Sequence, residues 1–134
     1  MNVFGDSSAF YAYLDKQDYC HLKAKEQMSS LIQSNDIIVS SNYIVIETIA
    51  LVQRRLGFDA VINFQEVIVP LLNVYFVNKE LHQKGIEFFL NESRRNLSLV
   101  DCVSFELMKQ LGLQKAFAFA FDKHFEEYGF GMFG

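Results

Sequence analysis

Four carboxylates in the sequence are candidates for one shared site: Asp6, Glu47, Asp101 and Asp122. Glu47 lies in YIVIETIALV, where a predicted helix is apolar on nearly every side, so no orientation places this carboxylate cleanly in water. A buried carboxylate without a partner becomes neutral or requires a cation. The next basic residue along this helix, Arg54, is two turns away and is expected on the opposite side. Glu47 is therefore predicted to belong to a functional site.

A site that gathers four carboxylates has a definite chemistry. Their mutual repulsion disfavours ionisation of all four unless a multivalent cation neutralises them. A donor set made of oxygen atoms favours Mg²⁺ or Mn²⁺ over Zn²⁺, for which His and Cys ligands are typical. Such an ion keeps several bound waters and is suited to binding a phosphate and activating a water. The four acids together predict metal-assisted hydrolysis of a phosphodiester.

Three of these acids also have a purely structural interpretation. Asp6 and Asp122 each precede a predicted helix, and aspartate is among the best N-cap residues. Asp101 stands in SLVD at the spacing of a capping box with Ser98, although Glu or Gln is usual at that position. Ser104 follows Asp101 by one turn and shares its face of the helix. The local sequence leaves capping and catalysis open at each acid.

Short apolar segments and amphipathic segments alternate along the chain. Strands are predicted at residues 3–5, 37–40, 73–77 and 115–121. Helices are predicted at residues 7–15, 20–33, 42–56, 58–70, 79–91 and 98–111, the first of them capped by Ser7 or Ser8. This order predicts an α/β three-layer sandwich, with a short parallel sheet of four or five strands flanked by helices. Asp6, Asp122 and the start of the helix that carries Glu47 fall at the carboxyl ends of strands, where such folds bind ligands.

Length and charge narrow the class of protein. With 134 residues and 51% hydrophobic residues the chain is expected to form one domain over residues 1–134. A net charge of −4 argues against a protein that holds nucleic acid mainly by bulk electrostatics, but not against a nuclease with its acids in one pocket. The N-terminus lacks the features of a signal peptide, so a cytoplasmic protein with no membrane partner is expected. Cys20 and Cys102 are expected to be reduced thiols.

Four segments carry a resemblance to a known family. VFGDSSAFYAYLD, SNYIVIETIALVQRRLG, NLSLVDCVSFELMKQLG and AFAFDKHFEEYGF resemble, in order and spacing, the PIN-domain ribonucleases, and most closely the VapC-type toxins of bacterial toxin–antitoxin pairs. The LSLVDCVSF and AFDKHF pieces are the most specific. The resemblance runs almost end to end, so it implies one PIN-like domain.

The resemblance implies an Mg²⁺- or Mn²⁺-dependent endoribonuclease that hydrolyses RNA phosphodiester bonds. The acids of the family fall on Asp6, Glu47, Asp101 and Asp122, which would hold the metal directly or through water, and its small hydroxyl residue falls on Ser104, which would orient a water or the phosphate. It further implies a toxin neutralised by a small antitoxin protein, and a homodimer. The alternative is a catalytically silent PIN-like module that binds RNA or a protein partner.

Several basic and aromatic residues are harder to assign. Arg94 and Arg95, in the charged loop ESRRN, could contact RNA phosphates or be simply solvated. Arg54 and Arg55 are interpreted as favourable charges at a helix C-terminus. His124 is assigned to the surface or to packing rather than to the site. The aromatic residues of AFYAYL and of the predicted fourth strand are assigned mainly to the core, with a groove for an antitoxin helix as the alternative for AFYAYL.

Overall fold

Five parallel strands form a single sheet at the centre of the computed structural model, which describes residues 1–119 and 123–134. The strands run in the order β3-β2-β1-β4-β5. Their bounds are β1 (Asn2–Gly5), β2 (Ile37–Ser41), β3 (Leu72–Tyr75), β4 (Lys115–Phe117) and β5 (Gly131–Met132). In the middle of the sheet Val3 is paired with Ile38 and Phe4 with Ala116. The N-terminal strand β1 is thus the central strand of the sheet, flanked by β2 on one side and β4 on the other.

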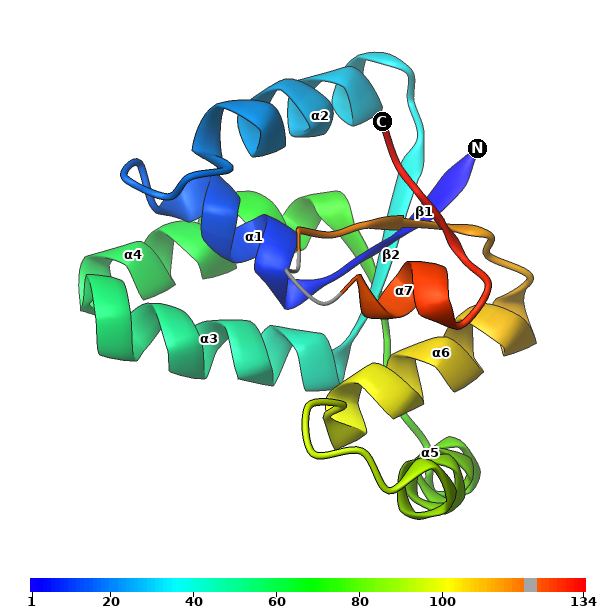
Figure 1. Cartoon of the computed structure of the whole chain (residues 1–134). Coiled ribbons are helices and arrows are strands. Elements are labelled where there is room, and N and C mark those ends of the chain that lie inside the picture. Colours follow the sequence, from blue (N-terminus) through cyan, green and yellow to red (C-terminus); the bar gives the residue numbers. More distant parts are fainter. Residues whose placement is uncertain (120–122) are drawn as a thin grey trace.

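Helices cover both faces of this sheet, as expected. They are α1 (Ser7–Leu14), α2 (His21–Gln33), α3 (Asn42–Leu56), α4 (Phe58–Asn63), α5 (Lys79–Glu92), α6 (Leu99–Leu111) and α7 (His124–Glu127), with a π-helical turn at Phe64–Ile68 and a 3₁₀ turn at Val69–Leu71. In Figure 1, α2 lies above the strands and α5 and α6 lie below them. The predicted three-layer α/β sandwich with a parallel sheet is therefore confirmed. None of the helices in the described part of the chain is long and apolar enough to cross a membrane.

Most helix boundaries follow from local signals that the sequence contains. The Asn78 side chain accepts a hydrogen bond from the Leu81 amide at 2.8 Å and so begins α5. Ser41 caps α3 in the same way. Gly112, with a φ of 70°, takes the left-handed conformation that ends α6. Polar caps and glycine stops thus place these helices close to their predicted bounds.

The N-terminus of α1 corrects one prediction. Asp6, and not Ser7 or Ser8, is the N-cap residue, because its Oδ2 accepts the Ser8 amide at 3.1 Å. The Asp6 amide donates to the Phe117 carbonyl at 3.0 Å, which keeps the chain extended through residue 6. The helix therefore begins at Ser7, as the interpretation of Asp6 as an N-cap predicts, and the two serines lie in its first turn.

The C-terminal part of the sheet also differs from prediction. The strand predicted at residues 115–121 ends at Phe117, because the Phe119 amide turns away to donate to the Ser8 hydroxyl at 2.9 Å. The fifth strand is the two-residue β5, which pairs with β4. The helix predicted over residues 58–70 divides into α4, the π turn and the 3₁₀ turn, which contains Pro70.

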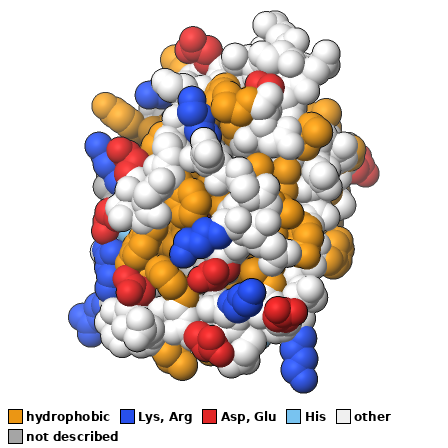
Figure 2. All heavy atoms as spheres, turned by 90° about the vertical axis from the view of Figure 1, so that its right-hand side faces the viewer, with side chains coloured by type: hydrophobic (Ala, Val, Ile, Leu, Met, Phe, Trp, Pro, Cys, Tyr) orange, Lys and Arg blue, Asp and Glu red, His pale blue; other side chains and the backbone are white. Residues whose placement is uncertain are grey.

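Aromatic side chains fill much of the core between these layers. The ring of Phe10 packs against Phe64 with centroids 5.8 Å apart, and Phe105 meets Phe125 edge to face at 5.3 Å. On the outside, Figure 2 shows one face where Lys, Arg, Asp and Glu side chains are interspersed around exposed apolar ones. Charges of both signs are mixed on this face, so it offers no extended basic surface to a nucleic acid.

Gly5, the last residue of β1, is required by close packing. A Cβ at this position would lie 2.5 Å from Cζ of Phe10 and 2.9 Å from Cγ2 of Ile38, and both side chains are buried. We expect Gly5→Ala to lower the free energy of unfolding by about 1–3 kcal/mol, the usual range for overpacking, as measured by urea denaturation. Gly131→Ala is the matched control, since its nearest neighbour would be 3.6 Å away. Equal stability of the two variants would contradict this account.

Candidate active site

The carboxyl end of β1 opens into a hollow of about 490 Å³, here called the acidic hollow. Its walls come from the start of α1, one face of α3, the loop before α6, the first turn of α6, and α7. The lining residues are Asp6, Ser7, Glu47, Ala50, Leu51, Arg54, Asn96, Ser98, Asp101, His124 and Phe125. Three of the four predicted carboxylates therefore meet at one edge of the sheet, where strand topology places ligands.

Asp6 is the most deeply buried of these acids. Only 6% of its surface is exposed. Burial raises the pKa of its carboxyl from 3.8 to about 6, hydrogen bonds from Ser8 oppose that rise, and the nearby charges of Asp101 and Glu47 add to it. The Ser8 hydroxyl donates to Oδ2 at 2.6 Å. Repulsion among the three carboxylates is thus already present in the hollow, and a bound cation would relieve it.

Glu47 projects into the acidic hollow from α3. It is half-buried, and its Oε1 accepts a hydrogen bond from the Ser7 hydroxyl. Burial raises the pKa of the Glu47 carboxyl, the Ser7 hydrogen bond lowers it, and the charge of Asp101 raises it further. The sequence places Glu47 among apolar residues, and the structure shows that its carboxylate is held at the hollow by Ser7.

Asp101 both caps a helix and faces the acidic hollow. The capping box is complete: the Ser98 hydroxyl accepts from the Asp101 amide at 3.0 Å, and Asp101 Oδ2 accepts from the Ser98 amide at 3.3 Å. The same Oδ2 lies 3.1 Å from Nδ1 of His124. The structural and functional interpretations of this acid are thus compatible, since one carboxylate serves the helix start and the hollow together.

A family model described as the PIN domain matches residues 3–131 of the chain. The chain belongs to the PIN-domain family. Relatives of this PIN domain include the 23S rRNA-specific endonuclease VapC20 of Mycobacterium tuberculosis, which is 30% identical over 129 residues. That match covers 96% of this chain and 95% of the relative. The resemblance seen in the sequence is therefore confirmed.

Solved structures agree with this assignment. The crystal structure of Mycobacterium tuberculosis VapC20, described as a sarcin-ricin loop cleaving toxin, superimposes with a TM-score of 0.82 at 30% identity, over 96% of this chain and 95% of that chain. VapBC-1 from nontypeable Haemophilus influenzae gives a TM-score of 0.67 at 12% identity, over 98% and 96%. FitAcB from Neisseria gonorrhoeae gives 0.69 at 15% identity, over 100% and 97%. The last two share the fold of this PIN domain.

The predicted site of this PIN domain also included Ser104 and Asp122. Ser104 is buried in α6, where its hydroxyl donates to the Val100 carbonyl at 2.8 Å, and it is not among the described residues that line the hollow. Asp122 lies outside the described residues. The structure thus places Asp6, Glu47 and Asp101 together and puts Ser104 one turn behind Asp101.

The two arginines of the loop before α6 have different surroundings. Arg94 donates through Nη1 to Glu127 at 2.8 Å and to the Tyr128 hydroxyl at 3.0 Å, so it ties this loop to α7. These contacts raise the pKa of the Arg94 guanidinium. Arg95 is exposed, and neither arginine is among the described residues lining the acidic hollow. Of the two, Arg95 has the more open side chain for an RNA phosphate.

Two residues of the acidic hollow were missed by reasoning from the sequence. Arg54 lines it together with Glu47, so the expectation that it lies on the opposite side of the helix is wrong. Seven residues are close to two full turns of an α-helix, which brings Arg54 back to the face of Glu47. His124 is 6% exposed and lies beside Asp101, which agrees with packing but also brings it to the hollow. The seven-residue spacing could have identified Arg54, whereas the approach of His124 depends on the tertiary fold.

The chemistry of the acidic hollow fits a hard divalent cation. Its acidic donors are all carboxylate oxygens, and the pKa values of Asp6 and Glu47 are raised partly by other carboxylates. Within residues 1–119 and 123–134, no cluster of three or more His, Cys, Asp or Glu side chains is close enough to form a ready-made metal site. Hydrogen bonds to serine groups and to His124 instead hold the three acids around the hollow. The described residues therefore offer carboxylate oxygens, the donors that hard divalent cations prefer.

Proposed function

We propose that this PIN domain is an endoribonuclease that hydrolyses RNA phosphodiester bonds with Mg²⁺ or Mn²⁺ at the acidic hollow. The observation that carries the proposal is the meeting of Asp6, Glu47 and Asp101, from three distant segments, in one hollow. The chain is also 30% identical, over 96% of its length, to a 23S rRNA-specific endonuclease. By the same relationship we infer that it acts in the cytoplasm as the toxin of a toxin–antitoxin pair.

The cation would be held by Asp6, Glu47, Asp101 and Asp122. A bound divalent cation supplies positive charge for the phosphate and a water of lowered pKa. The chain itself presets the donors: Ser8 donates to Asp6, Ser7 donates to Glu47, and Ser98 and His124 hold Asp101. Such partners fix ligand orientation before the substrate arrives. None of the described side chains that line the hollow needs to form a covalent bond with the RNA.

Other residues have supporting roles in this proposal. Arg54 lines the acidic hollow from the last turn of α3, where its guanidinium can donate hydrogen bonds to a phosphate oxygen of the RNA. Arg95 is the second candidate for a phosphate contact. Ser104 holds the Val100 carbonyl, next to Asp101 in the chain, so it positions the turn that carries this acid. In this proposal the carboxylates hold the cation, and the arginines contact the phosphates of the RNA.

Partners of the chain are inferred from its exposed apolar residues. Phe58, Ile62, Val67 and Leu71 are 64%, 41%, 53% and 48% exposed along α4 and the two turns that follow it. Apolar surface of this kind is typical of interfaces between proteins. We infer that the chain forms a homodimer and that a small antitoxin protein binds and silences it.

Divalent cations decide between an enzyme and a silent binding module. We expect the purified protein to cleave single-stranded RNA in Mg²⁺ or Mn²⁺, to lose that activity completely in EDTA, and to regain it when the cation is restored. The measurement is the appearance of 5′-labelled fragments on a denaturing gel. Cleavage that survives EDTA would contradict the mechanism. RNA binding without cleavage in either cation would favour the silent PIN-like module.

A further inference from the structure

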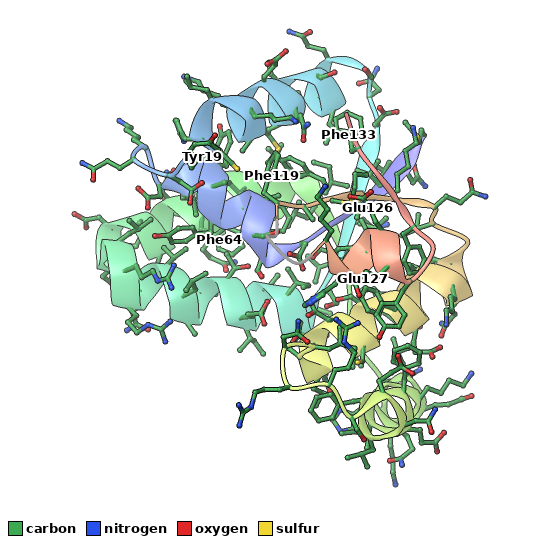
Figure 3. The ribbon with its side chains drawn as sticks, in the orientation of Figure 1. Tyr19, Phe64, Phe119, Glu126, Glu127 and Phe133 are labelled. Carbon is green, nitrogen blue, oxygen red and sulfur yellow. The ribbon has the colours of Figure 1, made fainter. Side chains whose placement is uncertain are left out.

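A second hollow, of about 390 Å³, lies beside the acidic hollow and has a different lining. Three aromatic side chains line it, Tyr11, Tyr19 and Phe119, together with Arg55 and Leu51. We call it the aromatic hollow. Figure 3 shows Tyr19 and Phe119 close together near the start of α2. We propose that the aromatic hollow binds one unpaired base of the RNA whose phosphate is held at the acidic hollow.

The two hollows adjoin each other. Leu51 lines both of them. Ser7 lines the acidic hollow and Ser8 the aromatic one, and Arg54 and Arg55 are divided in the same way. A nucleotide whose phosphate sits by the carboxylates therefore has a base within reach of the aromatic hollow. This inference rests on the proposed function for the placement of the phosphate.

The side chains of the aromatic hollow suit a base. Aromatic rings and guanidinium groups are the usual stacking partners of unpaired bases in RNA-binding proteins. Tyr19 is 98% exposed and so presents a ring that the core does not use. The guanidinium of Arg55 lies 5.5 Å from the centre of the Tyr11 ring, which adds positive charge beside an aromatic surface. An exposed ring, a half-buried ring of Phe119 and a cation thus surround one small cavity.

The position of this cavity favours a base over a peptide helix. The aromatic hollow shares Leu51 with the acidic hollow, so the two adjoin. Its continuity with a site that attracts a metal-bound phosphate matches a nucleotide. A protein partner is the alternative that the following test separates.

The test compares two fluorescein-labelled decamers, an oligo(A) RNA and an abasic ribose-phosphate chain of the same charge. Binding is measured by fluorescence anisotropy in Ca²⁺, which like Mg²⁺ is a hard cation that takes oxygen ligands. A denaturing gel establishes that the RNA stays intact during the measurement. We expect Tyr19→Ala and Phe119→Leu to weaken binding of oligo(A) by about 5- to 100-fold each, the range for loss of one stacked base. Binding of the abasic decamer should be unchanged, because both variants keep the phosphate contacts.

Matched variants separate stacking from other effects. Tyr19→Phe keeps the ring and should bind oligo(A) like the parent. Phe76→Ala removes an aromatic side chain that is 74% exposed elsewhere and should also bind like the parent. Equal affinity of Tyr19→Ala and the parent for oligo(A), or an equal loss with the abasic decamer, would overturn the inference. Cleavage assays of the parent in Mg²⁺ test the proposed function separately, so failure of either claim is distinguishable from failure of the other.

Discussion

Asp6→Asn is expected to reduce RNA cleavage by about 10²–10³-fold or more, the range for loss of one preorganised electrostatic group at a reaction centre. Asparagine removes the negative charge of Asp6, which is 6% exposed and is the most buried of the three acids. The substitution leaves the fold intact, because asparagine is as good an N-cap as aspartate and its side-chain oxygen can still accept the Ser8 amide. The measurement is single-turnover cleavage of labelled RNA in Mg²⁺ at pH 8.

The control for this prediction is Asp59→Asn. Asp59 is an exposed acid in the first turn of α4, so its loss removes a charge of the same type away from the acidic hollow. We expect this variant to cleave RNA at the rate of the parent. Circular dichroism establishes that both variants are folded. Cleavage by Asp6→Asn within a few-fold of the parent would remove Asp6 from the proposed metal ligands.

The same substitution is expected to stabilise the metal-free protein at pH 8, by up to about 3 kcal/mol in the free energy of unfolding. Burial raises the pKa of Asp6 from 3.8 to about 6, so the folded chain binds a proton more tightly than the unfolded chain. Above pH 6 the carboxyl is charged in both states, and the cost of burying this charge destabilises the folded state in full. Below pH 3.8 it is neutral in both states and the penalty vanishes. Asparagine carries no such charge at any pH.

Urea denaturation in EDTA at a series of pH values tests the sign of this effect. The stability difference between Asp6→Asn and the parent should be largest above pH 6 and should shrink as the pH falls toward 3.8. Asp59→Asn, at an exposed site, should show no comparable change. If this stability difference grew as the pH fell, or if Asp6→Asn were less stable than the parent at pH 8, the predicted destabilising effect of the Asp6 charge would be wrong. Lost activity together with gained stability is the expected sign of a functional acid.

Local patterns predicted a large part of this molecule. Alternating strands and helices, polar caps and glycine stops gave the layers of the fold, and the apolar surroundings of Glu47 pointed to a site before its partners were known. Arg54 was assigned wrongly, although helix geometry alone places it on the face of Glu47. The rotation about the helix axis between residues 47 and 54 was misjudged, although it follows from the number of residues alone.

Other features depend on contacts between distant segments. Asp6, Ser7 and Ser8 are all good caps, and the choice of Asp6 is made by its amide, which bonds to Phe117 in another strand. His124 meets Asp101 across a separation of 23 residues. The strand β5 has only two residues, too few for a periodic pattern. Long-range pairing decides such features, so local sequence could not predict them.

The central position of β1 has a consequence for how the protein is made. The first strand pairs with β4, and the Ser8 hydroxyl accepts from the Phe119 amide across a separation of 111 residues. His124, which holds Asp101, also comes from this late part of the chain. A nascent chain on the ribosome therefore lacks a finished acidic hollow until residues 115–125 have emerged. Synthesis itself delays the moment at which a newly made nuclease can meet the RNA around it.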